Sequence, residues 1–148
     1  MKTNAKLMIV LQKMSSVFLE ALSQNINDLG LTVSEFLILS HLRKAEREKT
    51  QQLGSIAGIT SGTITYTVNK LEKQGFVVKV QDEIDKRIVW VEITEKGKHH
   101  FDTIFVQHDE YLDSLLAVFT EQEKLDFIEQ VKYFGKTIEQ HTMKGIRQ

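Results

Sequence analysis

The side chains best suited to bind a polar partner lie on one face of a helix predicted between Ile59 and Gly75. Ile64, Val68 and Leu71 have the spacing of a buried helical stripe, so the residues opposite them must face outward. That outward face and its flanks carry Ser61, Gly62, Thr63, Thr65, Tyr66, Asn69, Lys70 and Lys73. Their small hydroxyls, phenol, amide and ammonium groups can form hydrogen bonds to base edges and phosphates. The alternative is the ordinary polar face of a surface helix.

A second candidate site lies at the tip of a predicted two-stranded ribbon. Residues 76–80 are rich in β-forming side chains, and residues 87–94 alternate between apolar and polar side chains. The polar connection between them suits a hairpin tip and brings together Asp85, Lys86 and Arg87. Taken alone, an exposed carboxylate and guanidinium form a surface ion pair of little energetic value. A short helix, a second helix with a polar outer face and a polar-tipped hairpin are nevertheless the order of a winged helix-turn-helix.

Other kinds of site are not supported by the residues present. The chain has no cysteine, which excludes disulfides, thiolate metal sites and catalytic thiols. Among five histidines, His99 and His100 are adjacent and would point ~100° apart on a helix, so they do not form a pair of metal ligands. The sequence contains no Gly-rich phosphate loop and no hydrolase or metalloprotease motif. We therefore expect no enzyme activity, no metal and no cofactor.

Length and hydropathy indicate one domain with helical extensions. The chain has 148 residues, of which 41% are hydrophobic. No run approaches the ~18 apolar residues that a membrane span requires. The amphipathic spacing near the N-terminus fits a soluble helix better than a signal peptide. We expect a cytoplasmic protein with no membrane contact.

Charge is distributed unevenly along the chain. The formal net charge of −1 divides into +2 over residues 1–59, +1 over residues 60–100 and −4 over residues 101–148. The weak overall charge counts against a nucleic-acid partner, for which a basic surface is expected. The excess of acidic over basic side chains, however, lies in residues 101–148, outside the polar-faced helix and the ribbon. Binding to DNA would then depend on a few well-placed cations.

Capping signals predict the helices that precede the polar-faced helix. A long helix is predicted over residues 5–28, and a second, buried helix starts at a capping box formed by Thr32 and Glu35. The charged run 43–49 is expected to be a solvated turn. Thr50 is then expected to cap a short third helix.

Similar signals follow the ribbon. Thr94 is predicted to cap a fifth helix that extends to Phe119, and a capping box of Thr120 and Glu123 starts a sixth. The expected fold is mainly α with a small β-wing, in the order α-α-α-α-β-β-α-α, as a single domain over residues 1–148.

The first, fifth and sixth helices carry more apolar residues than one winged-helix lobe can bury. We therefore assign residues 32–98 to the winged-helix lobe and residues 1–28 and 101–148 to a helical dimerisation lobe. The expected interface residues are Leu7, Leu11, Leu115, Phe119, Leu125, Ile128 and Val131. The simplest way to cover them is a symmetric homodimer. A monomer with a helical cap over its core is the alternative.

Two segments resemble the MarR family of bacterial transcriptional regulators: ITSGTITYTVNKLEKQGFV over residues 59–77 and DKRIVWVEITEKG over residues 85–97. The second has the family's Asp-x-Arg wing signature and Thr-x-x-Gly helix start. The resemblance implies that the helix over residues 61–74 lies in the DNA major groove. It also implies that Arg87, held by Asp85, enters the adjacent minor groove, where a narrow groove attracts arginine. We expect a homodimeric repressor that binds a pseudo-palindromic site in double-stranded DNA.

The resemblance also implies a small-molecule effector. The family usually responds to small molecules, often phenolic or other aromatic compounds, in a crevice between the DNA-binding lobe and the dimer helices. In this chain the crevice would be lined by Phe18, Phe36, His41 and His99. Residues 51–66 are most similar to the branch that contains quinone- and catechol-responsive repressors. The alternative for these four residues is that the aromatic ones belong to the ordinary core and the histidines to the ordinary surface. The alternative for the whole chain is a protein-interaction module that does not read DNA.

Overall fold

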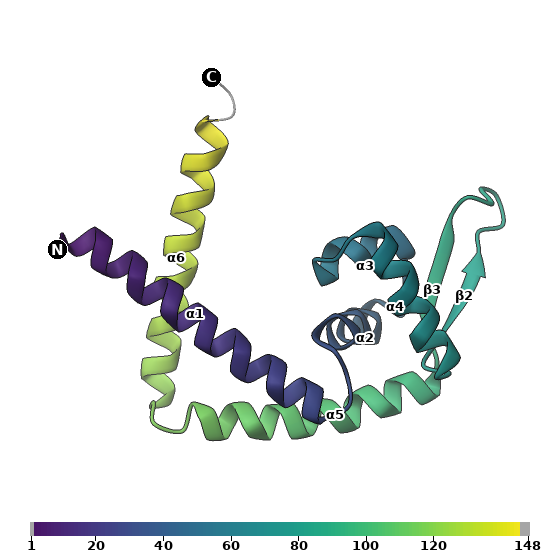
Figure 1. The fold of residues 1–148 in the computed structure, drawn as a ribbon, viewed down its shortest axis with the longest axis horizontal. Coiled ribbons are helices and arrows are strands. Elements are labelled where there is room, and N and C mark those ends of the chain that lie inside the picture. The colour runs from purple at the N-terminus through teal and green to yellow at the C-terminus, as the bar shows by residue number, and fades with distance from the viewer. Residues whose placement is uncertain (1, 146–148) are drawn as a thin grey trace. The chain divides into compact units, whose positions relative to one another are not determined.

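The computed structural model describes residues 2–145, with side chains for residues 2–142. Met1 and residues 146–148, the end of the predicted dimerisation lobe, lie outside this range. Over the described residues the elements are α1 (Thr3–Asp28), α2 (Val33–Ala45), β1 (Arg47–Lys49), α3 (Thr50–Ala57), α4 (Ser61–Lys73), β2 (Val77–Gln81), β3 (Val89–Ile93), α5 (Glu95–Leu115) and α6 (Glu121–Gly145) (Figure 1). The predicted mainly helical fold with a small β-wing is confirmed.

The chain divides into two compact units, Met1–Glu110 and Tyr111–Gln148. The first unit contains the helix-turn-helix and the β-wing, and α6 belongs to the second. The division into a winged-helix lobe and a dimerisation lobe stays a prediction.

The charged run 43–49, expected to be a turn, contains a strand instead. Arg47, Glu48 and Lys49 form β1, which pairs antiparallel with β3, so the sheet has the order β1-β3-β2. The strand has only three residues, all of them charged, so it shows none of the apolar alternation by which strands are recognised in sequence. The strand forms because of a tertiary contact: β1 makes hydrogen bonds to the edge of β3 that β2 leaves free.

The core of the first unit surrounds α2. Ile38, Leu39 and Leu42 are fully buried, and α3, α4 and the sheet pack around them (Figure 1). Gly54 of α3 permits a close approach to α4, because an added Cβ would lie 3.4 Å from the Ile64 side chain. The helix-turn-helix is thus a packed part of the core.

The predicted capping box of α2 is confirmed. The Thr32 amide donates to the Glu35 carboxylate at 2.8 Å, and the Glu35 amide donates to the Thr32 hydroxyl at 3.2 Å. The predicted cap at Thr50 is wrong, because Lys49 occupies that position and the Thr50 hydroxyl donates to the Val89 carbonyl of β3. Pairing of β1 with β3 brings the two chain segments together and gives that hydroxyl a tertiary acceptor.

The β-ribbon meets α5 at a crowded junction. The Thr94 hydroxyl accepts a hydrogen bond from the Gly97 amide at 3.0 Å, which confirms Thr94 as the cap. A Cβ on Gly97 would lie only 2.1 Å from the Phe76 carbonyl oxygen. This glycine is therefore required by the contact between two backbones.

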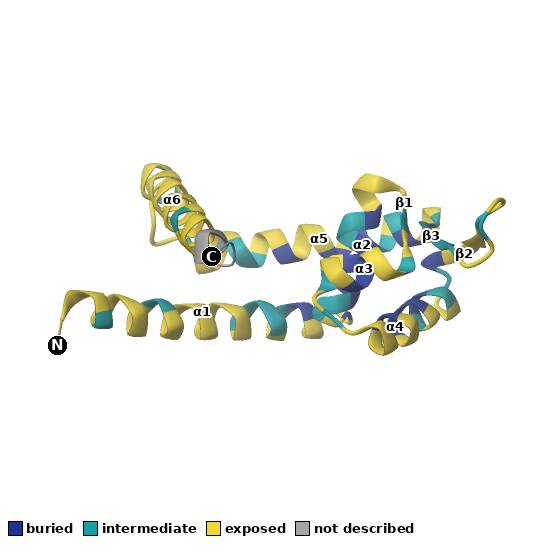
Figure 2. Cartoon of the chain, turned by 90° about the horizontal axis from the view of Figure 1, so that it is seen from above, coloured by how far each residue is buried: buried dark blue, intermediate teal, exposed yellow. Residues whose placement is uncertain are grey.

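The helices outside the winged-helix core expose many apolar side chains, as the mostly exposed colouring of α1 and α6 in Figure 2 shows. Leu7 of α1 is 48% exposed, and Leu125 of α6 is 56% exposed. The fifth helix ends at Leu115, four residues before the predicted Phe119, and the chain turns before α6. Within the described residues, no helix is long and apolar enough to cross a membrane.

Candidate nucleic-acid interface

The outer face of α4 gathers most of the polar residues that the sequence assigned to it. Tyr66 is 71% exposed, while Ile64 and Val68 on the opposite face are buried. The other exposed members of this face are Ser61, Gly62, Thr63, Thr65, Asn69 and Lys73. An exposed helix face of small and polar residues fits the major groove of B-DNA, although contact with DNA stays a prediction for each of them.

Lys70 differs from the other members of this set. Its ammonium lies 2.6 Å from a carboxylate oxygen of Glu35, a side chain that is only 2% exposed. Lys70 is therefore occupied by a contact within the protein.

Lys79 of β2 is a member of the site that sequence reasoning missed. Its ammonium donates to the Asn69 side-chain oxygen at 2.8 Å and lies 2.9 Å from the carboxylate of Glu72. The hydrogen bond from Lys79 lowers the pKa of Glu72. Lys79 thus ties β2 to the outer half of α4. Ten residues separate it from Asn69 in the sequence, so only the fold brings the two together.

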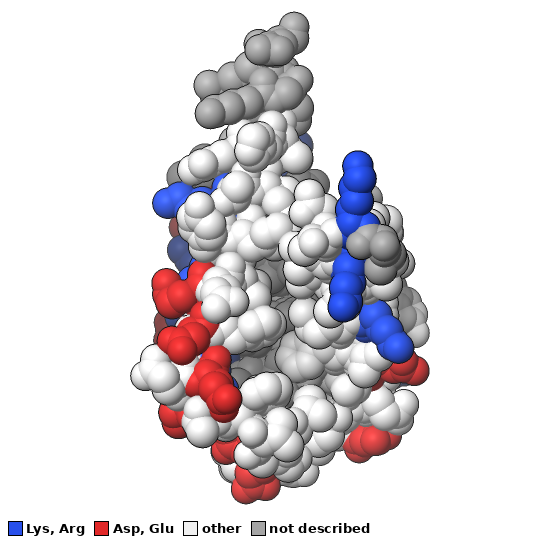
Figure 3. All heavy atoms as spheres, turned by 90° about the vertical axis from the view of Figure 1, so that its left-hand side faces the viewer, with Lys and Arg blue, Asp and Glu red and all other residues white. Residues whose placement is uncertain are grey.

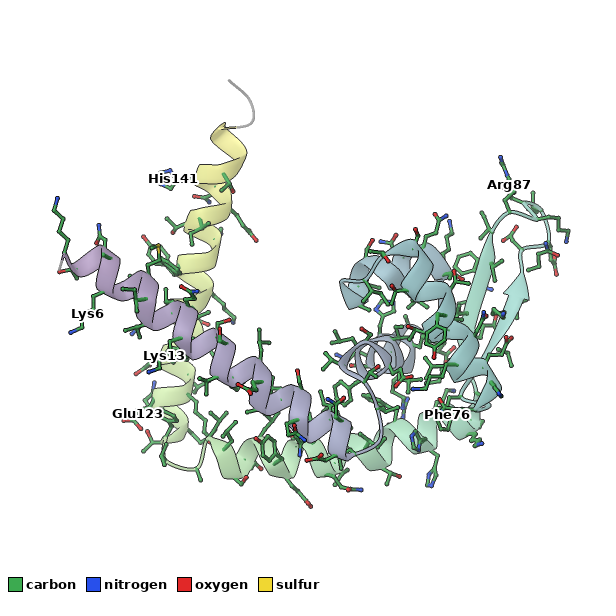
Figure 4. The ribbon with its side chains drawn as sticks, in the orientation of Figure 1. Lys6, Lys13, Phe76, Arg87, Glu123 and His141 are labelled. Atoms are coloured by element: carbon green, nitrogen blue, oxygen red, sulfur yellow. The ribbon has the colours of Figure 1, made fainter. Side chains whose placement is uncertain are left out.

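Asp85 and Arg87 form the expected pair on the wing. Two nitrogens of the Arg87 guanidinium donate to the two oxygens of Asp85, both at 3.0 Å. This pairing lowers the pKa of Asp85. The Arg87 side chain is 91% exposed and projects from the end of the ribbon (Figure 4). A bidentate carboxylate restricts its rotamers while leaving the other edge of the guanidinium free.

Asp82 stabilises the turn that carries this pair. One of its carboxylate oxygens accepts from the Trp90 indole, and the other accepts from the amides of Ile84 and Asp85, all at 2.9 Å. These bonds, the Trp90 bond first, lower the pKa of Asp82 to about 2. Lys86 folds back, its ammonium donating to the Asp82 carbonyl at 3.1 Å. An aspartate that begins a hairpin tip is an Asx-turn signal, which could have identified Asp82 from sequence.

Trp90 also contacts β1. The Arg47 guanidinium lies 4.7 Å, and the Lys49 ammonium 5.4 Å, from the centre of its ring. These cation–π contacts hold two cations of β1 beside the base of the wing.

A groove of about 430 Å³ separates α4 from the wing. Its lining residues are Lys49, Thr50, Gln51, Gln52, Thr65, Val68, Asn69, Lys79, Arg87, Ile88 and Val89. The three charged residues in this lining are all basic. The face drawn in Figure 3, by contrast, carries both basic and acidic side chains. The groove is therefore basic, although the whole chain has a formal net charge of −1.

The four residues predicted to line an effector crevice have separate surroundings. Phe36 is a core residue whose ring centre lies 5.3 Å from that of Phe101. His41 lies 3.3 Å from Glu48, Phe18 is 37% exposed on α1, and His99 is exposed on α5. Their role in ligand binding stays a prediction.

His108, which was not among those four, is the buried histidine of this region. It is 6% exposed, and its Nδ1 donates to the Asn25 side-chain oxygen at 2.7 Å. Its ring also packs edge-on against Phe36, at 5.1 Å between ring centres. Burial lowers the pKa of His108 and so favours the neutral ring. Among the described residues, no group of three or more His, Cys, Asp or Glu side chains could hold a metal ion.

Known proteins are similar to this chain in sequence and in fold. Residues 21–104 match the family described as transcriptional regulator SarA/Rot. The HTH-type transcriptional regulator MhqR of Bacillus subtilis is 31% identical over 135 residues, which cover 91% of this chain and 93% of MhqR.

Solved structures agree on the fold. A MarR family protein from Bacillus stearothermophilus has a TM-score of 0.75 at 20% identity, covering 93% of this chain and 96% of that one. The organohalide-sensing regulator RdhR-CbdbA1625, in its 2,4-dichlorophenol-bound form, has a TM-score of 0.74 at 17% identity, covering 93% and 82%. The chain belongs to the MarR/SarA type of winged-helix transcriptional regulators.

Proposed function

We propose that this protein is a cytoplasmic repressor that binds a pseudo-palindromic DNA site as a homodimer and is released by a small phenolic or other aromatic effector. The observation that carries the DNA-binding part is the basic groove between α4 and the wing. The exposed polar face of α4 lies on one side of it, and Arg87 lies on the other. A helix in the major groove, a phosphate backbone along the groove and Arg87 in the minor groove would use all three features together.

Homodimerisation is supported by the exposed apolar residues of α1 and α6. On α6, Leu125, Ile128 and Val131 are 45–56% exposed at helical spacing. A single chain leaves this stripe in water, whereas a two-fold partner would cover it. Two DNA-binding lobes about 34 Å apart would then meet successive major grooves.

An effector would act by changing the separation or tilt of the two lobes. A small rotation of each lobe would disturb both major-groove contacts at once. The regulator RdhR-CbdbA1625, a neighbour in fold, was solved with 2,4-dichlorophenol bound, which supports phenols as the first class of compound to try.

DNA binding is tested with a labelled duplex from the region upstream of the protein's own gene, by fluorescence anisotropy between 50 and 200 mM salt. Counterion release predicts that log affinity falls linearly with log salt concentration. Arg87→Ala should weaken binding by about 1–3 kcal/mol, which is roughly 5- to 150-fold. Lys132→Ala is the control, because it also removes one exposed cation, but from α6, which carries none of the residues predicted to contact DNA. An absence of duplex binding at low salt would favour the protein-interaction module.

The dimer and the effector are tested separately. Leu125→Asp or Ile128→Asp should convert a dimer into monomers in sedimentation analysis, because a carboxylate would be buried in the apolar interface. A monomeric wild-type protein would contradict the dimer. A panel of phenols, quinones and catechols should contain a compound that releases the duplex, and a panel without effect would remove the aromatic effector from the proposal.

A further inference from the structure

Glu35 is a carboxylate held almost completely out of water. It is 2% exposed, so its charge must be satisfied by protein groups. One oxygen accepts from the Thr32 amide at 2.8 Å, as part of the α2 capping box. The other lies 2.6 Å from the Lys70 ammonium of α4. A single buried side chain therefore joins the first turn of α2 to the helix that carries the DNA-reading face.

Lys70 and Lys73 provide a contrast within one helix. Lys73 is exposed on the outer face of α4, without an ion pair in the described part of the chain. Lys70 is one residue before the fully buried Leu71 and directs its ammonium toward α2. Two lysines three positions apart thus have different surroundings, because Lys70 is 42% exposed but paired with a buried carboxylate, whereas Lys73 is exposed and has no such pair among the described residues.

We propose that Lys70 is a positioning residue, which fixes the recognition helix α4 against α2 through Glu35 and does not bind a DNA phosphate. The proposal rests on the DNA-binding function given above, and it replaces the expectation that Lys70 contacts DNA. The pair works together with Lys79, which holds the neighbouring Asn69 from the β2 side. The helix is thereby tied to the core on one flank and to the ribbon on the other.

The two partners respond differently to removal. Lys70→Met leaves the Glu35 carboxylate buried without its cation, which is strongly unfavourable. Glu35→Gln removes the charge but keeps an oxygen for the Thr32 amide, since glutamine also serves in a capping box. The double variant removes both charges and leaves no unpaired carboxylate. Lys70→Arg retains the cation.

The salt dependence of DNA binding separates positioning from phosphate contact. A lysine that neutralises one phosphate contributes about 0.9 to the slope of log affinity against log salt. Lys73→Met, the matched control, should reduce the slope by about that amount. Lys70→Met should lower affinity about tenfold or more with the slope unchanged, while Lys70→Arg should stay within about threefold of the wild type. Glu35→Gln should also weaken binding, and the double variant should bind better than Lys70→Met.

The opposite pattern would overturn the proposal. If Lys70 binds a phosphate, Lys70→Met reduces the slope by about 0.9 and Glu35→Gln raises affinity, because it frees the lysine and removes a negative charge. Circular dichroism establishes that each variant is folded. If Lys70→Met does not fold, the slope of the double variant decides the question, because that variant lacks the cation and leaves no unpaired carboxylate. Failure of the wild type to bind any duplex would instead refute the DNA-binding function itself, on which the role of Lys70 rests.

Discussion

Gly97 lies where the start of α5 meets the backbone that leads into β2, and Gly97→Ala is expected to be strongly destabilising. The added Cβ would lie 2.1 Å from the Phe76 carbonyl oxygen and 2.9 Å from its carbon. Both are backbone atoms, so no side-chain rotation relieves the overlap. That carbonyl also accepts from the Thr94 amide at 3.0 Å and from the Thr94 hydroxyl at 3.2 Å.

The cost can be worked out from these contacts. Overpacking a rigid site costs about 1–3 kcal/mol, and each weakened hydrogen bond costs about 1 kcal/mol. The better helix propensity of alanine returns about 1 kcal/mol. The net loss is about 2–4 kcal/mol, a large part of the roughly 5–15 kcal/mol that stabilises a typical domain.

Urea and thermal unfolding, followed by circular dichroism, measure this loss. Gly97→Ala should lower the melting temperature by about 10 °C. Gly62→Ala is the matched control, because an added Cβ there meets no atom within 4 Å, and its stability should rise by roughly 0.5–1 kcal/mol. A Gly97→Ala protein within about 0.5 kcal/mol of the wild type would refute the reasoning.

Three further predictions concern protonation and base reading. The pKa of Asp82 is lowered to about 2, so its contribution to stability is present above the ordinary pKa and is lost as the pH falls through about 2. Fluorescence of Trp90, the one tryptophan of the chain, should therefore change near pH 2, and a midpoint near the ordinary aspartate value of about 4 would contradict the bond between them. Burial lowers the pKa of His108 from 6.5, so the unfolded state binds a proton more readily than the folded state and stability should fall as the pH drops below 6.5. His108→Gln should flatten this dependence in urea unfolding, and an unchanged slope would mean that another group is responsible. Tyr66→Ala should alter the bases preferred in a selection from random duplexes, whereas an equal loss for every sequence would place Tyr66 on phosphate alone.

Local signals in the sequence were sufficient for most of the helices and for the outward face of α4. The spacing of Ile64, Val68 and Leu71 determines which side of that helix is buried, because a helix repeats every 3.6 residues wherever it lies in a fold. Capping boxes depend only on residues three apart, so those of Thr32 and Thr120 could be recognised before any tertiary contact was known. The pairing of Asp85 with Arg87 is equally local.

Tertiary structure decided the features that depend on partners far apart in the chain. β1 is a strand because β3 had a free edge, and its three charged residues carry no strand pattern of their own. Lys79 joins the site because pairing of β2 places it beside Asn69. The wheel position of Lys70 allowed an outward or an inward ammonium, and only the packing of α2 against α4 placed Glu35 within its reach. The sequence alone therefore determined which face of each helix is polar, and the fold decided which of its charges are already paired, because an ion pair depends on distance in space and not along the chain.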